Sequence, residues 1–256
     1  MPFPTIVGYS LIGVNNGWSF RTVVFKNVGG GTFDLATLEV KKNTGADYGT
    51  SGMSSIKANG FIVRKMSTAG AYLTDYHYIT CISGSGAVPQ KGWYEGGTNL
   101  VASPVLLNDG EGVIILTTKS DAAILMNGEV DLVCKNTVPN GWSFSGNSTP
   151  KEFKLTDISV IKNSGAEYSA SGMGSIKANG FTIRKISSAG AYLDAYHYIT
   201  CVSGSGAVAE KGWYKNGNVL VTSESEDNLT FAPGEGFIVL TTKSDAMLVL
   251  PSPISE

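Results

Sequence analysis

The sequence predicts an all-β protein made of two similar tandem β-sandwich or β-barrel domains from an internal duplication. Three observations lead to this fold class. Most of the sequence occurs in two similar copies, and short apolar runs are separated by Gly and Asn. No stretch longer than about two turns has apolar residues at helical spacing. Short strands at a spacing of about 8–12 residues are typical of sandwiches and barrels.

The duplication is visible residue by residue. Residues 45–94 align with residues 165–214 without a gap, and 37 of these 50 pairs are identical. A match of this length indicates two copies of one fold rather than a short shared motif. We therefore predict two repeated β-domains, 1–127 and 128–256, with their junction near 125–130.

The local pattern within each copy is that of strands. The segments FIVRK and FTIRK alternate, and the copies differ where Ile62 corresponds to Thr182 and Val63 to Ile183. The position that accepts Thr is expected to face outward and its neighbour inward, because successive strand residues point to opposite faces.

Turn residues predict the connections. Residues 92–101 and 212–221 read as hairpins, the second with the Asn-Gly pair that a type I′ turn favours. Residues 236–250 form a further predicted hairpin that turns at Lys-Ser-Asp. Single helical turns are expected within residues 34–40 and 154–160.

The strand YHYITC is apolar on both faces. Tyr76 and Tyr78 point one way, and His77 and Ile79 point the other way. Such a strand is expected to be covered on both sides. The cover is either a domain or subunit contact, where Tyr is favoured, or a long loop over a central sandwich strand. The same choice applies to the corresponding Tyr196 and Tyr198.

The composition limits the classes of partner. Charged residues make up 16% of the chain, the net charge is −2, and no basic block occurs, so nucleic-acid binding is not expected. No secretory signal and no apolar run of about 20 residues is found, which predicts synthesis in the cytoplasm without membrane insertion. Three cysteines, of which two match between copies, are expected to be buried thiols rather than disulfides.

The candidates for catalysis are weak. His77 and Cys81 lie four strand residues apart, about 13 Å, which is too far for a thiol–imidazole pair. The segment SGSGA (83–87 and 203–207) lacks the helix start that a phosphate loop needs. The carboxylates of NDGEG are too few for calcium, because the second copy keeps only Glu235. We expect no cofactor, no metal and no enzymatic activity.

Aromatic residues are the best binding candidates. Trp93–Tyr94 and Trp213–Tyr214 begin hairpins on a weakly charged, glycine-rich scaffold, where such rings can stack on sugars. Because the two residues of each pair are adjacent, one ring should face the core and the other outward. The alternative is a core Trp beside a surface Tyr with no binding role.

The segments GWYKNGNVLV and LTFAPGEGFIVLTT resemble β-rich modules of structural and surface proteins of bacteria and their phages. This resemblance implies a non-catalytic building block. We therefore expect a self-assembling structural protein, either a virion component such as a tail, capsid or decoration protein, or a filament or shell subunit. Its partner would be itself, with other structural proteins or glycans as further partners. The alternative is a tandem carbohydrate-binding module.

Overall fold

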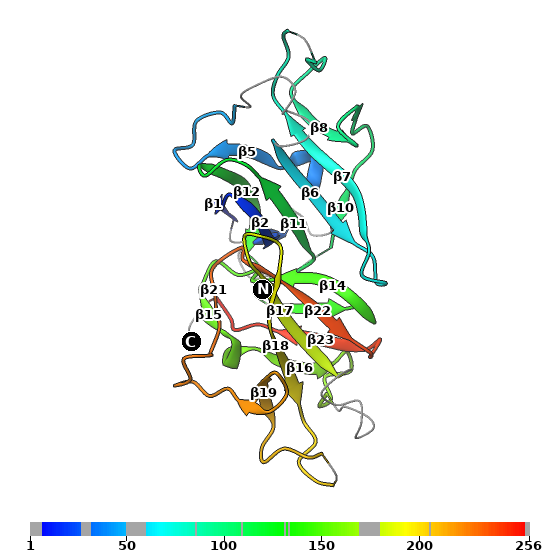
Figure 1. Ribbon diagram of the computed structural model, residues 1–256, viewed down its shortest axis with the longest axis vertical. Coiled ribbons are helices and arrows are strands. Elements are labelled where there is room, and N and C mark those ends of the chain that lie inside the picture. Colours follow the sequence, from blue (N-terminus) through cyan, green and yellow to red (C-terminus); the bar gives the residue numbers. More distant parts are fainter. Residues whose placement is uncertain are drawn as a thin grey trace, which may run out of the picture.

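The computed structural model shows an all-β chain in which four larger sheets pack face to face in succession, like the blades of a four-bladed propeller (Figure 1). The part of the chain that the structure describes contains no α-helix. That part comprises residues 7–26, 32–49, 60–84, 86–108, 110–130, 132, 134–168, 180–204 and 206–253.

The strands of the first half are short and connected by turns. They are β1 (Val7–Val14), β2 (Gly17–Thr22), β3 (Phe25–Lys26), β4 (Phe33–Asp34), β5 (Glu39–Lys42), β6 (Phe61–Met66), β7 (Tyr72–Ile79), β8 (Gly92–Glu95), β9 (Asn99–Leu100), β10 (Leu106–Leu107), β11 (Gly112–Thr117) and β12 (Ala122–Val130). One 3₁₀ turn, η1 (Leu35–Thr37), lies between β4 and β5, where a helical turn was predicted.

The second half repeats this series. Its strands are β13 (Lys135–Val138), β14 (Gly141–Gly146), β15 (Phe153–Lys154), β16 (Ser159–Lys162), β17 (Phe181–Ile186), β18 (Tyr192–Ile199), β19 (Gly212–Lys215), β20 (Val219–Leu220), β21 (Thr230–Phe231), β22 (Gly236–Thr241) and β23 (Ala246–Val249). The second predicted helical turn is the 3₁₀ turn η2 (Leu155–Asp157).

The sheets of the two halves have matching strand orders. A six-stranded sheet has the order β2-β11-β6-β7-β8-β9 in the first half and β14-β22-β17-β18-β19-β20 in the second. Opposite it lies a smaller sheet, β1-β12-β3 with β5 paired to β12, or β13-β23-β16 in the second half. The predicted hairpins β8–β9, β19–β20 and β22–β23 are present, which confirms the all-β fold class.

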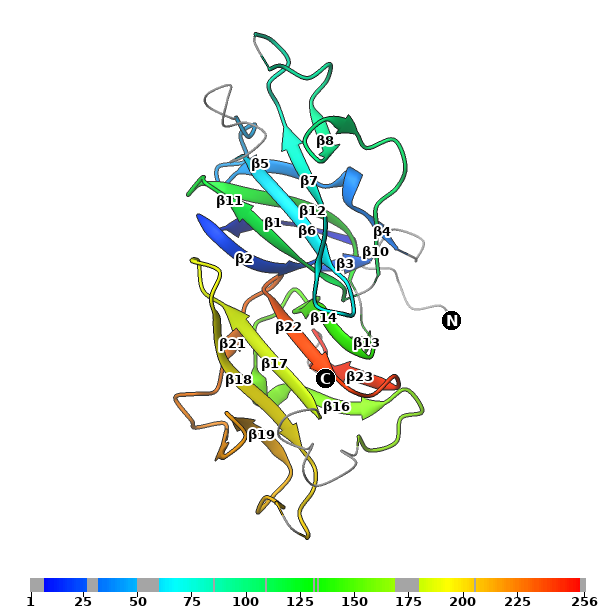
Figure 2. The same cartoon turned by 45° about the vertical axis from the view of Figure 1, so that its right-hand side comes forward.

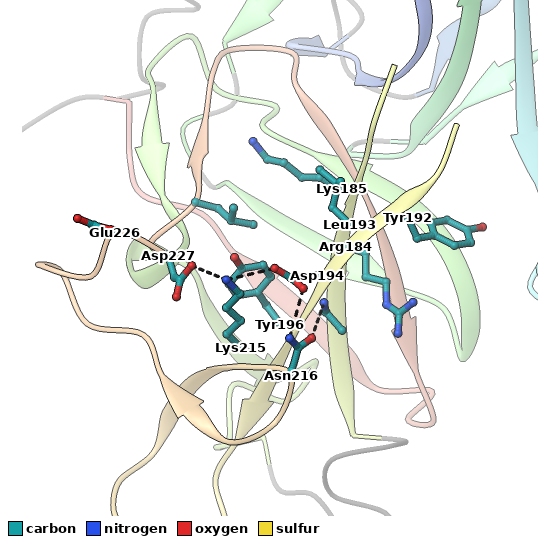
Figure 3. Close-up of a pocket in the computed structure, with 12 residues that line it drawn as sticks. Arg184, Lys185, Tyr192, Leu193, Asp194, Tyr196, Lys215, Asn216, Glu226 and Asp227 are labelled. Atoms are coloured by element: carbon teal, nitrogen blue, oxygen red, sulfur yellow. Dashed lines mark hydrogen bonds and ion pairs between the residues drawn. The ribbon is translucent and has the colours of Figure 1, made fainter. Parts of the chain in front are cut away.

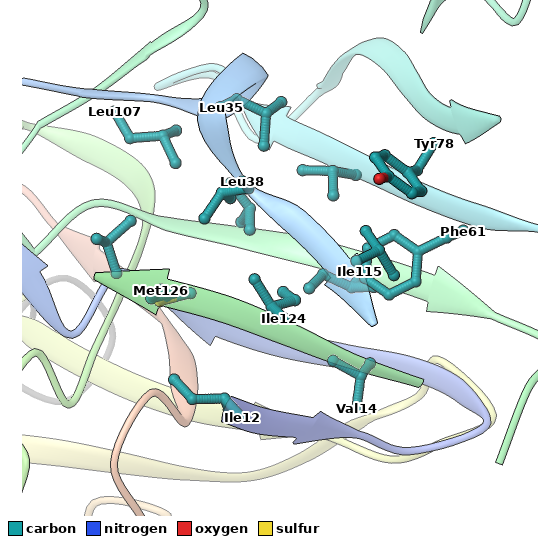
Figure 4. Close-up of a cluster of buried hydrophobic side chains, with 14 of the residues drawn as sticks. Ile12, Val14, Leu35, Leu38, Phe61, Tyr78, Leu107, Ile115, Ile124 and Met126 are labelled. Carbon is teal, nitrogen blue, oxygen red and sulfur yellow. The ribbon is translucent and has the colours of Figure 1, made fainter. Parts of the chain in front are cut away.

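Each half buries an apolar core between its two sheets (Figure 4). In the first half, β1 and β12 contribute Ile12, Val14 and Ile124, while β6 contributes Phe61. The corresponding ring in the second half, Phe181, is likewise fully buried. Inward residues alternate with residues of the opposite face, as a pleated strand requires.

The opposite faces of the two six-stranded sheets pack against each other. Phe20 and Phe144 meet there with ring centroids 4.8 Å apart, next to Ile114 and Ile238. Thr182, predicted to face outward, lies on this side of β17 and is buried (5% exposed), as is Ile62. Thr182 therefore lies on the predicted side of β17, and it is buried there although it points away from the core.

Two hairpin turns exchange contacts between the halves. The backbone N–H of Trp18 donates to Ser188 O, and that of Trp142 donates to Thr68 O, each at 2.9 Å. Gly70 sits directly over Trp142 with φ +85°, and a Cβ there would lie 2.9 Å from the indole. A glycine is required at this turn by both its conformation and the close approach.

The matching loops lie at opposite ends of the molecule. The connection between β7 and β8 forms one end of the long axis, and the connection between β18 and β19 forms the other (Figures 1 and 2). The SGSGA segments belong to these loops, and no helix follows them. Their central residues, 85 and 205, and the Asp109 considered for calcium lie outside the described residues.

The expected junction between the halves falls inside a strand. β12 continues to Val130, and Glu129 and Val130 still pair with Lys26 and Phe25 of β3. Residues 128–130 thus belong to a strand that pairs with the first half, and the division into 1–127 and 128–256 stays a prediction.

Candidate functional site

The four aromatic residues predicted for binding are all buried. Trp93, Tyr94, Trp213 and Tyr214 are exposed by at most 4%. The indole N–H of Trp93 donates to Leu38 O at 2.9 Å, and that of Trp213 donates to Ile158 O at 3.0 Å. The expected surface position of one ring in each pair is therefore not found, because both rings are buried.

The loop at each end of the molecule explains this burial. Tyr94 points away from the main core but packs with Ile79 and Val88, and its hydroxyl donates to Gln90 O at 2.7 Å. Tyr214 makes the same contact with Glu210 O at 2.8 Å. The loops therefore cover the outer side of these strands.

The tyrosines of the YHYITC strands face the cores. Tyr78 lies 5.2 Å from Trp93 and Tyr198 lies 5.2 Å from Trp213, both as edge contacts. Tyr76 is partly buried and Tyr196 is buried. Burial raises the pKa of both hydroxyls. On the outer side of β7, Ile79 packs with Val88 of the loop between β7 and β8.

The histidine candidates are packing residues. His77 is 8% exposed, and the Nδ1 of the matching His197 lies 3.2 Å from Thr182 Oγ1. Cys81 and Cys201 each donate from sulfur to a serine carbonyl two residues on, at 3.2 Å. None of the three cysteines forms a disulfide, and only Cys134 is fully buried.

The carboxylates that occupy corresponding positions in the two copies form ion pairs with lysines. Glu111 pairs with Lys65 at 2.8 Å, and Glu235 pairs with Lys185 at 2.6 Å. Each of these acids therefore neutralises a neighbouring lysine.

Exposed aromatic residues occur where the two halves meet. Tyr72 and Tyr192 are 45% and 47% exposed and stack on Trp18 and Trp142, with centroids 6.4 Å apart in both pairs. Burial raises the pKa of Tyr72, and its neighbour Tyr192 adds to this shift. Leu73 and Leu193 follow these tyrosines and are about half exposed. We call Tyr72, Leu73, Tyr192 and Leu193 the junction patch.

A cavity of 640 Å³ lies in the second half, and part of its lining comes from positions where the two copies differ (Figure 3). Lys215 Nζ contacts Asp227 Oδ1 at 2.6 Å and Asp194 Oδ2 at 3.2 Å. The Asn216 amide donates to Asp194 Oδ1 and accepts from the Ala195 N–H, both at 3.3 Å. Both carboxylates raise the pKa of Lys215, so it stays protonated.

Sequence reasoning missed this cavity, although a signal was present. Where the second copy has Asp194, Lys215 and Asn216, the first has Thr74, Glu95 and Gly96. The connection before β21 spans residues 221–229, nine residues, against the five of 101–105 before β10. Changes confined to one copy, taken together with the longer loop that supplies Asp227, indicate the site.

Other classes of site find no support in the described residues. No group of three His, Cys, Asp or Glu side chains that could hold a metal ion occurs among them. In the same residues, no helix has the length and apolar character needed to cross a membrane. Comparison of the chain with family models, curated proteins and solved structures finds no match.

Proposed function

We propose that the chain is a non-catalytic structural protein that assembles with copies of itself. The observation that carries this proposal is the open edge of β1. Among the described residues this eight-residue strand pairs only with β12. An unpaired strand edge is a template for pairing with another chain.

The outward backbone groups of β1 can be identified. Gly13 O accepts from Arg21 Nη2 at 3.0 Å, so it points away from β12. Asp121, just before β12, accepts from the Asn43 N–H at 2.7 Å, so its backbone groups point toward β5. Because the direction alternates along a strand, the backbone groups of Ala122 and Ile124 point toward β1, where their partners are Val14 and Ile12. The N–H and C=O groups of Tyr9, Leu11 and Gly13 therefore face outward.

The same edge is accessible near Tyr9. Tyr9 is 80% exposed, the largest exposure of any large apolar side chain described. A 450 Å³ cavity separates Ser10–Gly13 from the turn that carries Pro233. The corresponding strand β13 has only four residues, so each chain offers one long edge. Two chains paired antiparallel through β1 form an isologous dimer.

A second surface extends the assembly beyond a dimer. The junction patch gathers four large side chains, each about half exposed, from both halves. Contiguous exposed apolar residues mark interaction sites. Two independent contacts per chain support a filament, a shell or a virion component such as a tail, capsid or decoration protein.

The repeated sheets support the finer fold proposal as well. We infer that the halves are two sandwich-like domains from a duplication, because their strand orders match and each has its own core. The alternative of a tandem carbohydrate-binding module through Trp93 and Trp213 is not favoured, since both rings are buried.

The test compares Leu11→Pro with Leu11→Ala by analytical ultracentrifugation from about 1 to 200 µM. Proline removes an outward N–H, and edge strands tolerate it there, whereas alanine keeps the donor and removes the side chain. We expect the wild type and Leu11→Ala to exceed the 26.9 kDa monomer mass, and Leu11→Pro to remain monomeric with an unchanged melting temperature.

Electron microscopy of the associated fraction then identifies filaments, rings or shells. A wild-type protein that stays monomeric over the whole range contradicts self-assembly. Association that persists in folded Leu11→Pro contradicts the role of β1.

A further inference from the structure

We propose that Arg184 binds a carboxylate side chain of a second copy of the chain, as Arg64 binds Asp75 within the first half. This inference rests on the proposed self-assembly and names one of its contacts. It follows from the outer faces of the two six-stranded sheets, where the corresponding arginines stand opposite different residues.

In the first half the arginine is neutralised from the neighbouring strand. Arg64 of β6 stands opposite Asp75 of β7, and its Nε and Nη2 donate to the two carboxylate oxygens at 2.5 and 2.9 Å. Its guanidinium also lies 5.2 Å from the Trp18 ring. A planar guanidinium that donates from two nitrogens is the geometry by which arginine recognises a carboxylate.

In the second half the corresponding position lacks a carboxylate. Arg184 lies two residues after Thr182, hence on the same outer side of β17, and it stands opposite Ala195 of β18. Arg184 makes no hydrogen bond, ion pair or ring contact with any described residue, and no dashed line reaches it in Figure 3. The methyl group of Ala195 cannot replace a carboxylate, so the charge of Arg184 is not neutralised within the described part of the chain.

Two acids that line the same cavity as Arg184 are already bound. Asp194 and Asp227 both contact Lys215, and Figure 3 shows Arg184 extending on the other side of the strands. Successive strand residues point to opposite faces, so Asp194 does not lie on the face of Ala195 and Arg184. Arg184 itself is half-buried and accessible from the cavity. Because it has lost part of its contact with water, a carboxylate supplied from outside stabilises its charge.

The surroundings of Arg184 favour a protein partner. Tyr192 of the junction patch pairs with Ile186, two residues after Arg184 on β17. One guanidinium–carboxylate pair in contact with water contributes little affinity alone, so the neighbouring apolar patch has to supply most of the contact. Arg and Tyr are among the residue types that contribute most to protein interfaces. A second copy can supply the acid, since the chain has 21 Asp and Glu against 19 Lys and Arg.

The first test supplies Arg184 with an internal counter-ion. Ala195→Asp reproduces the arrangement of the first half, so that Arg184 no longer needs a carboxylate from another chain. We expect this variant to associate at least about tenfold more weakly in analytical ultracentrifugation, and Arg184→Gln to do the same. Thr98→Asp is the matched control, because it adds the same charge at an exposed turn of the other half. Its association should equal that of the wild type.

A zero-length cross-link then identifies the acid. In the Arg184→Lys variant, a water-soluble carbodiimide activates the neighbouring carboxylate, and the amine at position 184 attacks it to form an amide. The carbodiimide takes up the oxygen that the carboxylate loses and leaves as a urea. With a mixture of ¹⁴N- and ¹⁵N-labelled chains, mass spectrometry should find peptide pairs of mixed label that join position 184 to an Asp or Glu of another chain. The wild type is the control, because its guanidinium does not form this bond.

The outcomes separate this contact from self-assembly as a whole. A wild type that stays monomeric contradicts both the self-assembly and the role of Arg184. Association that is unchanged in folded Ala195→Asp and in Arg184→Gln overturns the role of Arg184 and leaves self-assembly standing. Cross-links from position 184 that form only within one chain overturn the assignment to a second copy.

Discussion

The two halves of the molecule share a framework but distribute their charges differently. In the first half, Arg64 forms a bidentate pair with Asp75, at 2.5 and 2.9 Å, and its guanidinium lies 5.2 Å from the Trp18 ring. In the second half Ala195 stands opposite Arg184. Arg184 forms no ion pair with any residue in the described part of the chain.

The difference comes from the movement of one acidic residue by one position. The first copy reads Thr74–Asp75 where the second reads Asp194–Ala195. Because strand residues alternate between faces, this shift transfers the carboxylate from the outer face of the sheet to the cavity side. There it meets Lys215, which the first half lacks. Two halves with the same strand order can thus differ by a polar site on one sheet.

The largest loss of stability is expected when the buried tryptophan of either core is removed, and comparing the two losses tests whether the cores are packed equally well. Trp93→Ala and Trp213→Ala should each lower the free energy of unfolding by about 3–5 kcal/mol, since each removes a buried ring and its hydrogen bond. Chemical denaturation followed by the fluorescence of the remaining tryptophans measures this. If the halves unfold as one unit, both variants shift a single transition by similar amounts. A loss below about 1 kcal/mol in either variant would contradict equivalent packing.

A smaller change in stability is expected at the ion pair that the first half has and the second half lacks. Asp75→Ala should cost about 1 kcal/mol, because the pair is partly exposed and screened by solvent. Ala195→Asp should recover a few tenths of a kcal/mol by placing a carboxylate opposite Arg184. Thermal unfolding of both variants and of the double variant measures these changes. Stabilisation by Asp75→Ala would show that the outer pair is not favourable.

The smallest expected effect is the dependence of stability on pH through the carboxylate of Asp194. Hydrogen bonds from Asn216 and then Lys215 hold the pKa of Asp194 below its ordinary value. The stabilisation from this carboxylate is therefore complete above an unfolded pKa of about 3.9 and is lost as pH falls through the lower folded pKa. Carboxyl ¹³C NMR should find the midpoint below 3.9, and Asn216→Gly should raise it. An unshifted midpoint in the wild type contradicts the network.

Local sequence patterns were enough for the strands, the hairpins and the repeat. The type I′ signal near Asn216 and the alternation of FIVRK depend only on neighbouring residues, so they could be predicted. The burial of Tyr94 could not, because it depends on Val88 and the loop that folds over the strand. The burial of Thr182 on the outer side of β17 likewise could not be predicted from neighbouring residues.

The candidate sites show the same limit. The cavity joins Asp194, Lys215 and Asp227, which become neighbours only when β18, β19 and the following loop are in place. The differences between the two copies can be read from the sequence, but they do not predict that these three side chains lie next to one another. The open edge of β1 was also not predictable, since strand order within a sheet is set by long-range pairing.

The positions of the matching loops at the two ends of the long axis give the molecule two similar ends (Figures 1 and 2). Turned end for end, it presents nearly the same surface, and Ile82 at one end is replaced by Val202 at the other. The four additional residues between β20 and β21 and the cavity beside them distinguish one direction from the other.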